Sequence, residues 1–148
     1  MAIINAEDSI LGRLASHVAK RALLGEEIIV INAEKAFVSG KPKSILDDEL
    51  KKLRIKNIGS PLRGPFHQRR PDRYVRKAIK RMLPTEKTRG IEAFERVMVY
   101  MGVPKTEILK NHKIDMDNVK IETVESSKKK INGLTVEEIC KFVSGKNA

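Results

Sequence analysis

The residues of this chain with the clearest capacity for chemistry are basic, and they are concentrated in one short stretch. The nineteen residues from Arg63 to Arg81 hold six arginines, two lysines and a single acid, Asp72. A guanidinium group binds phosphate oxygens through two parallel hydrogen bonds and stacks on bases, whereas an ammonium group is a hydrated point charge. Because like charges this close together repel one another, the stretch predicts a polyanionic partner that neutralises it.

The charge of the whole chain points to the same region. The 148 residues carry a formal net charge of +11. Residues 51–90 hold fourteen Lys or Arg and two acids, which gives a net charge of +12. The rest of the chain holds sixteen Lys or Arg and seventeen acids, which gives a net charge of −1. Seventeen of the nineteen lysines lie outside the stretch from Arg63 to Arg81, while six of the eleven arginines lie within it. Such a block indicates nucleic acid or an anionic membrane surface as the partner; a solvated charged face is the alternative.

Apolar periodicity predicts a helix from Pro71 to Leu83 with two opposite faces. Pro71 fits the first helical turn, where its missing N–H group costs no hydrogen bond. The apolar face holds Val75, Ala78, Ile79, Met82 and Leu83. The basic face holds Arg73, Arg76, Lys77, Lys80 and Arg81. We expect the first face to pack on the domain and the second to contact the partner.

The segment before this helix, Leu62 to Arg70, has no periodicity and is predicted to be an extended loop. Its candidate contact residues are Arg63, Phe66, His67, Arg69 and Arg70. The Phe66 ring either stacks on a base or closes the core beneath the loop, and the sequence leaves both roles open. Four lysines in the preceding segment are predicted to widen the footprint through phosphate contacts: Lys41, Lys43, Lys52 and Lys56.

Three polyanions fit the basic face unequally. A membrane surface is disfavoured because the apolar face is small and is better used for the core of the domain. DNA reading is disfavoured because the chain shows no helix-turn-helix spacing, zinc finger or zipper, and the helix has no Asn or Gln to read base edges. RNA requires only Arg and Lys at phosphate spacing and a loop that follows an irregular surface. The sequence therefore favours an RNA backbone.

A small nucleotide-using α/β enzyme is the strongest rival interpretation. The turn NAEDSILG, from Asn5 to Gly12, lies between a strand and a helix N-terminus, where phosphates often bind. It has one glycine and two acids, so it matches neither the dinucleotide-binding nor the P-loop pattern. His17 and His112 are isolated and are expected at the surface, and Cys140 is expected in the core. With no acid pair or triad, the sequence favours a protein that is not an enzyme and holds no metal.

The elements that position the basic stretch begin with a strand at Ile3-Ile4. A helix from Leu11, capped by Ser9 and ended by Gly25, and a strand at Ile28–Ile31 complete a βαβ unit with a parallel pair. After the turn at Ser39–Lys43, a second helix is expected to start from a cap at Ser44. Its inward-facing residues are expected to be Ile45, Leu46, Leu50 and Leu53.

Beyond the basic helix, Thr85 is expected to start a helix that buries Ile91 and Phe94, and Val97 to Met101 reads as a strand. From Lys105 to Lys130 the pattern weakens, with one strand expected at Val119–Val124. Thr135 and Glu138 form a capping box that opens a last helix, with Val136, Ile139, Cys140 and Val143 on its apolar side. The length suits a single domain, residues 1–148, with the basic loop and helix at 62–83 and a less regular extension at 105–148.

The sequence also indicates the cellular compartment in which the protein is expected. Cys140 is the only cysteine, which excludes an internal disulfide, and MAIINAEDSILG lacks the basic and apolar regions of a signal peptide. The longest apolar run, Ile28 to Ile31, is too short to span a bilayer. We expect a soluble protein of a reducing compartment with no membrane partner.

Two separated motifs resemble one known family. The string RGPFHQRRPDRY, followed by VRKAIKRMLP, is similar to the signature of large-subunit ribosomal protein 13, the universal family, in its archaeal and eukaryotic form. GRLASHVAKRALLGEEIIVINAEK, with Ser39-Gly40 after it, resembles the opening strand–helix–strand of the same family. The likeness spans roughly residues 3–103, and Arg81 stands where many members have Gly.

The resemblance implies a three-layer α/β/α sandwich around a small, mostly parallel, four-stranded sheet. It further implies a structural protein of the cytoplasmic ribosome that binds large-subunit ribosomal RNA, contacts neighbouring ribosomal proteins and supports subunit assembly and translation. No catalysis, cofactor or small-molecule substrate comes with the family.

Overall fold

A four-stranded sheet lies at the centre of the computed structural model, which describes residues 1–113, 120–124 and 132–145. Its strands are β1 (Ala2–Asn5), β2 (Ile28–Ile31), β4 (Val97–Val99) and β5 (Ile121–Thr123). They are arranged in the order β4-β2-β1-β5, and each neighbouring pair is parallel. The two central strands are almost wholly Ile, Val and Ala, as expected for strands that are covered on both faces.

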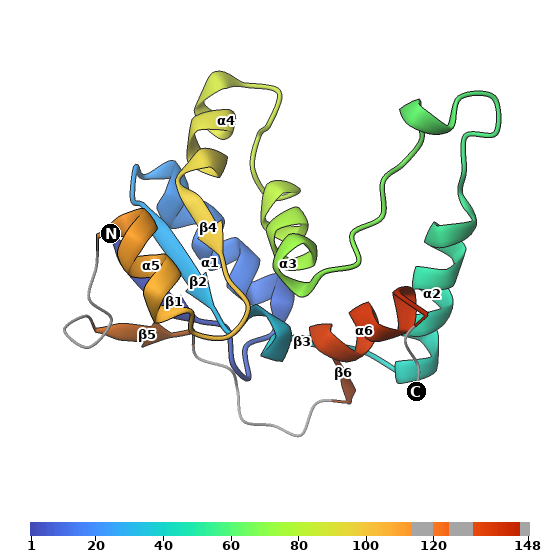
Figure 1. The fold of residues 1–148 in the computed structure, drawn as a ribbon, viewed down its shortest axis with the longest axis horizontal. Helices are drawn as coiled ribbons and strands as arrows, with labels where there is room; N and C mark the ends of the chain where they lie inside the picture. The colour runs from blue at the N-terminus through green and yellow to red at the C-terminus, as the bar shows by residue number, and fades with distance from the viewer. Residues whose placement is uncertain (114–119, 125–131, 146–148) are drawn as a thin grey trace.

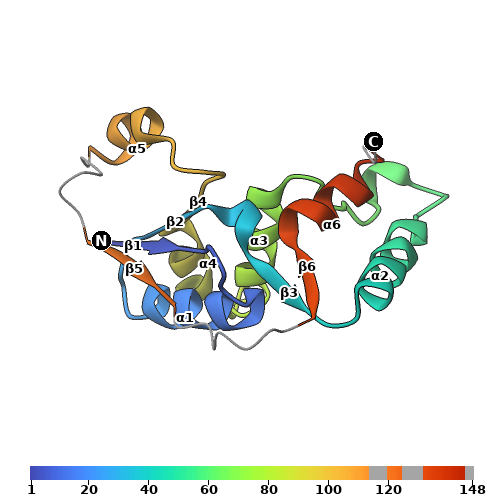
Figure 2. The same ribbon diagram turned by 90° about the horizontal axis from the view of Figure 1, so that it is seen from below.

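Helices cover the two faces unequally (Figure 2). On one face lie α1 (Leu11–Leu23), α3 (Pro71–Lys80) and α4 (Thr88–Glu95), whose buried residues join those of the sheet in the main core. On the other face, Ile108 of α5 (Lys105–His112) packs with Ile3, Ile29 and Ile31. The expected three-layer sandwich around a parallel sheet is therefore confirmed.

A second, smaller sheet extends the molecule beside the main one (Figure 1). Its strands, β3 (Phe37–Ser39) and β6 (Gly133–Thr135), pair antiparallel although almost a hundred residues separate them. Next to it lie α2 (Pro42–Arg54) and α6 (Val136–Val143). The predicted capping box of Thr135 and Glu138 is present, and Cys140 is buried as predicted. The small sheet itself was not predicted.

Two predicted helix caps are wrong. Ile10, not Ser9, is the N-cap of α1, because the Ser9 side chain is completely buried and reaches back toward the carbonyl of Glu7. The second helix begins at Pro42 rather than after Ser44, because proline is well suited to the first helical turn. Leu50, expected to face inward, is 38% exposed, whereas Glu49 is buried where the Tyr74 hydroxyl and the Lys52 ammonium contact it.

The boundaries around α3 and α4 also differ from the prediction. The regular part of α3 ends at Lys80, so Met82 lies beyond it and is exposed instead of facing the core. The next helix, α4, starts at Thr88 rather than Thr85, and it buries Gly90 and Ala93 while Ile91 is 48% exposed. Phe94 is half-buried: it packs against the main core, and the Arg76 and Lys80 side chains of α3 lie over its ring.

The remaining elements are short. The strand expected at Val97–Met101 ends at Val99, and α5 was not predicted at all. A strand expected at Val119–Val124 is present at Ile121–Thr123, while Val119 lies outside the described residues. Two 3-10 helices, η1 (Ala33–Lys35) and η2 (Pro61–Arg63), complete the elements of the described ranges.

Candidate nucleic-acid interface

The basic stretch begins in a segment that leaves the body of the molecule. From the end of α2 the chain runs outward and returns to the start of α3 (Figure 1). We call residues 55–70 the arm; its only regular element is the turn η2. The predicted irregular loop is therefore confirmed over most of its length, and Pro71 occupies the first turn of α3 as predicted.

Four arginines of the arm, of α3 and of its C-cap are exposed and have no partner within the described chain. They are Arg63, Arg69, Arg73 and Arg81. None of their guanidinium groups makes a hydrogen bond or an ion pair with residues 1–113, 120–124 or 132–145. Because each guanidinium carries five N–H donors in a planar fork, these side chains present unused capacity for a bidentate acceptor such as phosphate.

Other basic residues are held by neighbours within the chain. The Arg70 guanidinium lies 3.1 Å from the Asp72 carboxylate. The Lys77 ammonium donates to the backbone carbonyl of Phe66 at 3.3 Å, which joins the end of the arm to α3. Arg70 is nevertheless exposed, and an exposed ion pair contributes little stability, so its guanidinium is still available to a stronger acceptor.

The basic face of α3 divides into two sides. Arg76 lies over the Phe94 ring of α4, 4.6 Å from the ring centroid, and the Lys80 ammonium lies 5.6 Å from it. Both distances suit cation–π attraction, which holds the stems of these side chains against the body. Lys77 and Arg81 are on the opposite side, toward α2. The predicted face thus exists, but two of its five members also hold α4 in place.

Phe66 and His67 lie where the arm meets α3. The Phe66 side chain is 68% exposed, which contradicts the alternative in which it closes the core. His67 is half-buried, and its Nε2 atom is enclosed without a hydrogen-bond partner among the described residues. His17 is exposed as predicted, whereas His112 is half-buried and hydrogen-bonds to the Tyr100 hydroxyl at 3.0 Å.

The four predicted lysines of the wider footprint lie at the two ends of α2. Lys41 and Lys43 are at its start, while Lys52 and Lys56 are at the end from which the arm departs (Figure 1). A helix of thirteen residues is about 20 Å long, so the two pairs are well separated. All four are exposed, and Lys52 pairs with Glu49 at 2.7 Å. Of the four, Lys56 lies in the arm itself and Lys52 lies in the last turn of α2, from which the arm departs.

Glu49 and Tyr74 support the interface and were not identified from the sequence. The Tyr74 hydroxyl donates to the Glu49 carboxylate at 3.0 Å, which links α3 to α2. Burial, reinforced by the negative charge of Glu49, raises the pKa of Tyr74 above its ordinary value, so the hydroxyl remains a donor. A glutamate in a helix rich in charge gives no local signal of burial, because burial depends on the distant α3.

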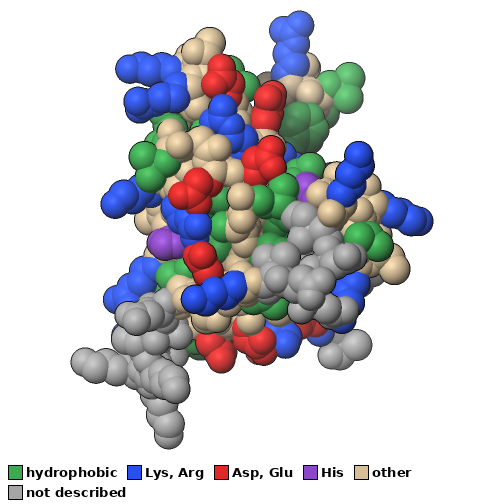
Figure 3. All heavy atoms as spheres, turned by 90° about the vertical axis from the view of Figure 1, so that its left-hand side faces the viewer, with side chains coloured by type: hydrophobic (Ala, Val, Ile, Leu, Met, Phe, Trp, Pro, Cys, Tyr) green, Lys and Arg blue, Asp and Glu red, His purple; other side chains and the backbone are tan. Residues whose placement is uncertain are grey.

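The side of the molecule away from the arm has a different surface. Acidic and basic side chains are interspersed there, with apolar side chains between them (Figure 3). Over the described ranges no three His, Cys, Asp or Glu residues gather into a group that could hold a metal ion. Over the same ranges no helix has the length and apolar character needed to cross a bilayer.

Comparison with known proteins gives a consistent result. A family model for ribosomal protein L13 matches residues 1–106. The chain is 49% identical over 106 residues to large ribosomal subunit protein uL13 of Methanocaldococcus jannaschii, which covers 71% of this chain and 77% of the relative. It is 47% identical over 106 residues to uL13 of Methanococcus maripaludis, with the same coverage. It is 39% identical over 145 residues to uL13 of Picrophilus torridus, a match that covers 97% of this chain and 96% of the relative. The residues matched by the family model include the arm and α3.

Proposed function

The chain belongs to the ribosomal protein L13 family, and we propose that it binds large-subunit ribosomal RNA through the arm and α3. Membership makes it a structural constituent of the large subunit of the cytoplasmic ribosome, and not an enzyme. Its partners are accordingly ribosomal RNA and other ribosomal proteins. Binding through the arm would support assembly of the subunit and hence translation.

The observation that carries this proposal is the set of unpartnered arginines. Arg63, Arg69, Arg73 and Arg81 are exposed and follow one another from the arm onto α3. In the free chain their mutual repulsion is unfavourable, and an RNA backbone supplies a regular series of acceptors that removes it. An arm with little regular structure also suits an irregular RNA surface better than a straight duplex groove.

The aromatic ring of Phe66 supports the same reading. At 68% exposure it is a large apolar surface with no cover in the described chain, and it stands between Arg63 and Arg69. Unpaired RNA bases stack on such rings, and each stacked base contributes roughly 1–3 kcal/mol of binding. We therefore assign Phe66 to base stacking.

Salt dependence tests the proposal. The full chain is titrated with large-subunit ribosomal RNA of Picrophilus torridus at several salt concentrations. If about six phosphates are neutralised, the logarithm of the association constant falls with the logarithm of salt with a slope of roughly −4 to −5. A slope near zero would show that binding does not depend on phosphate contacts and would contradict the proposal.

A charge reversal with a matched control assigns the contacts to the arm and α3. The test variant carries Arg63→Glu, Arg69→Glu and Arg73→Glu. The control carries Lys20→Glu, Lys110→Glu and Lys113→Glu, which make the same charge change at exposed residues of α1, of α5 and of the C-cap of α5. The test variant should bind at least about 100-fold more weakly at 0.15 M salt, with nearly unchanged thermal stability. Equal losses of RNA affinity in the two variants would show that binding depends on the net charge of the protein and not on these arginines, which would contradict the proposal.

A further inference from the structure

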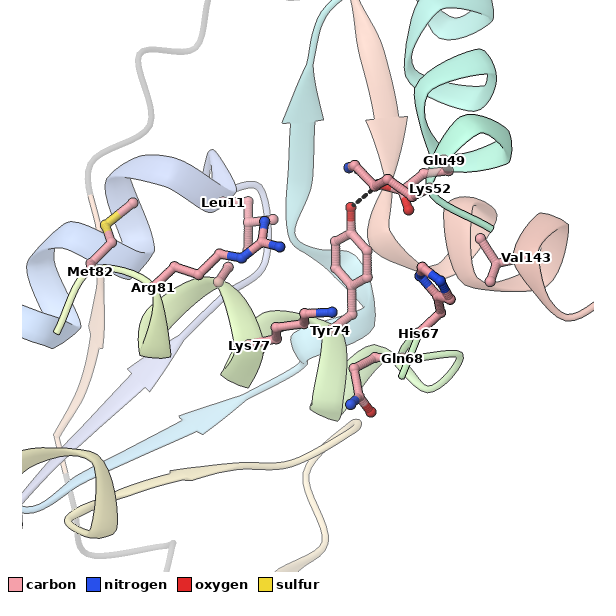
Figure 4. A pocket seen from close by; sticks show the side chains of 11 residues that line it. Leu11, Glu49, Lys52, His67, Gln68, Tyr74, Lys77, Arg81, Met82 and Val143 are labelled. Carbon is pink, nitrogen blue, oxygen red and sulfur yellow. Dashed lines mark hydrogen bonds and ion pairs between the residues drawn. The ribbon is translucent and has the colours of Figure 1, made fainter. Parts of the chain in front are cut away.

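A pocket lies behind the arm, between α2, α3 and α6 (Figure 4). Its volume is about 370 Å³, within the range of small-molecule sites. Tyr74 stands at its centre, with Lys77 and Arg81 on one side and His67 and Val143 on the other (Figure 4). The Tyr74 hydroxyl is fixed by its hydrogen bond to Glu49, so the ring is held in one orientation.

The pocket combines the chemical features that a nucleotide requires. The Tyr74 ring offers a surface for a flat aromatic base, and Leu11, Ala78 and Met82 are further apolar side chains of the lining. Three cations line it, Lys52, Lys77 and Arg81, against the single acid Glu49, which gives a net charge of +2 with His67 neutral. Lys52 is paired with Glu49 and Lys77 with a backbone carbonyl, whereas Arg81 has no partner in the described chain.

The position of the pocket connects it to the RNA-binding surface. Arg81 and Lys77 belong both to the basic face of α3 and to the pocket wall. His67, whose Nε2 lacks a partner, belongs both to the arm and to the pocket. An RNA strand that lies along the arm and α3 would therefore pass the pocket entrance, within reach of its cations.

We propose that this pocket takes up one unpaired nucleotide of the bound RNA. The base would enter against the Tyr74 ring and the apolar wall, and its backbone phosphate would be held by Arg81 and Lys77. The inference rests on the proposed RNA binding, and it adds that the chain receives an extruded base in addition to contacting the backbone.

Ultraviolet cross-linking of the unmodified protein is the first test. The full chain is irradiated with Picrophilus torridus large-subunit ribosomal RNA, digested, and searched by mass spectrometry for peptides that carry a nucleotide. We expect an adduct on Tyr74, because a base stacked on a ring is close enough to form a direct bond. Adducts confined to Phe66 and other arm residues would overturn the inference.

A pocket-filling substitution is the second test, because it leaves every charge in place. Ala78→Phe should occupy the pocket and weaken binding roughly 5- to 100-fold, the effect of losing one stacked base. The matched control, Thr106→Phe, adds the same ring at an exposed site of α5 and should leave affinity unchanged. If Ala78→Phe unfolds, the Tyr74 adduct in the wild-type protein decides the question.

The salt dependence of binding tests the nucleotide pocket separately from RNA binding through the arm and α3. Ala78→Phe removes no phosphate contact from the arm, so its slope should stay within about one unit of the wild-type slope. A steep slope in both proteins with equal affinities would refute the pocket and leave RNA binding intact. A flat slope for the wild-type protein would refute RNA binding itself.

Discussion

Cys140 shows how strongly position changes the chemistry of a single side chain. Its thiol is 3% exposed on α6. Burial, and then the negative charges of Glu49 and Asp72, raise its pKa from 9.0 to about 12. A raised pKa favours the protonated thiol at any lower pH. At pH 8 roughly one thiol in ten thousand is therefore ionised, against about one in ten for an unperturbed group.

This difference predicts slow alkylation of the native protein. At pH 8 Cys140 should react with iodoacetamide at least about 100-fold more slowly in the native chain than in guanidinium chloride, because only the thiolate is nucleophilic. Mass spectrometry of samples taken over time measures both rates. Similar rates with and without denaturant would show that the α6 core opens readily.

Single residues also show what the sequence could and could not predict at the interface. The concentration of arginine from Arg63 onward identified the basic surface, because charge and residue type need no structure to be read. The alternatives for Phe66 could not be separated, since burial of a loop aromatic depends on which distant side chains reach it. In the structure the Phe66 side chain is 68% exposed, which excludes the core role.

The turn from α3 to α4 depends on close backbone packing. A Cβ atom added to Gly90 would lie 2.1 Å from the carbonyl oxygen of Pro84, which is backbone and cannot move aside cheaply. A Cβ atom added to Gly12, in the first turn of α1, would meet nothing within 4 Å. The two glycines of the helices therefore serve opposite purposes, one required by packing and one replaceable.

Replacing each glycine by alanine should shift stability in opposite directions. Gly90→Ala should lower the free energy of unfolding by about 1–3 kcal/mol through overpacking. Gly12→Ala should raise it by up to about 1 kcal/mol, because alanine restricts the unfolded chain and favours the helix. Urea unfolding of the two variants beside the wild type measures both. A stable Gly90→Ala protein would mean that α4 can withdraw from Pro84 at little cost.

Elements with strong local patterns were predicted, and those set by distant contacts were not. The periodicity of α1, the β-branched run of β2 and the two-faced pattern of α3 are each contained within a dozen residues. By contrast, β3 and β6 have three residues each and exist because each finds the other across the chain. Leu50 and Ile91 were predicted to be buried but are exposed. Periodicity identifies apolar residues on a helix, but the element that packs against the helix determines which of them are buried.

At the scale of the whole molecule, charge is separated between two sides. The arm, α3 and the end of α2 carry the basic surplus, while the opposite side mixes both signs (Figure 3). A molecule so divided orients its basic side toward a polyanion before contact, since the field of clustered charge extends about a Debye length into solution. Under the proposed function, the extent of the basic footprint along α2 decides how much of the chain the RNA covers.

Single lysine-to-alanine variants of α2 measure that extent. Lys56→Ala should reduce the salt slope of RNA binding by about one, because Lys56 is exposed, unpaired in the described chain and lies in the arm just after α2. Lys52→Ala should reduce it by less, since its ammonium group already pairs with Glu49 at 2.7 Å. If the RNA follows α2, Lys41→Ala and Lys43→Ala should each lower the slope by a fraction of a unit to about one. Lys20→Ala is the control. Unchanged slopes for Lys41→Ala and Lys43→Ala would show that the RNA contacts only the end of α2 next to the arm. Unchanged slopes for all four variants would show that the RNA does not contact α2.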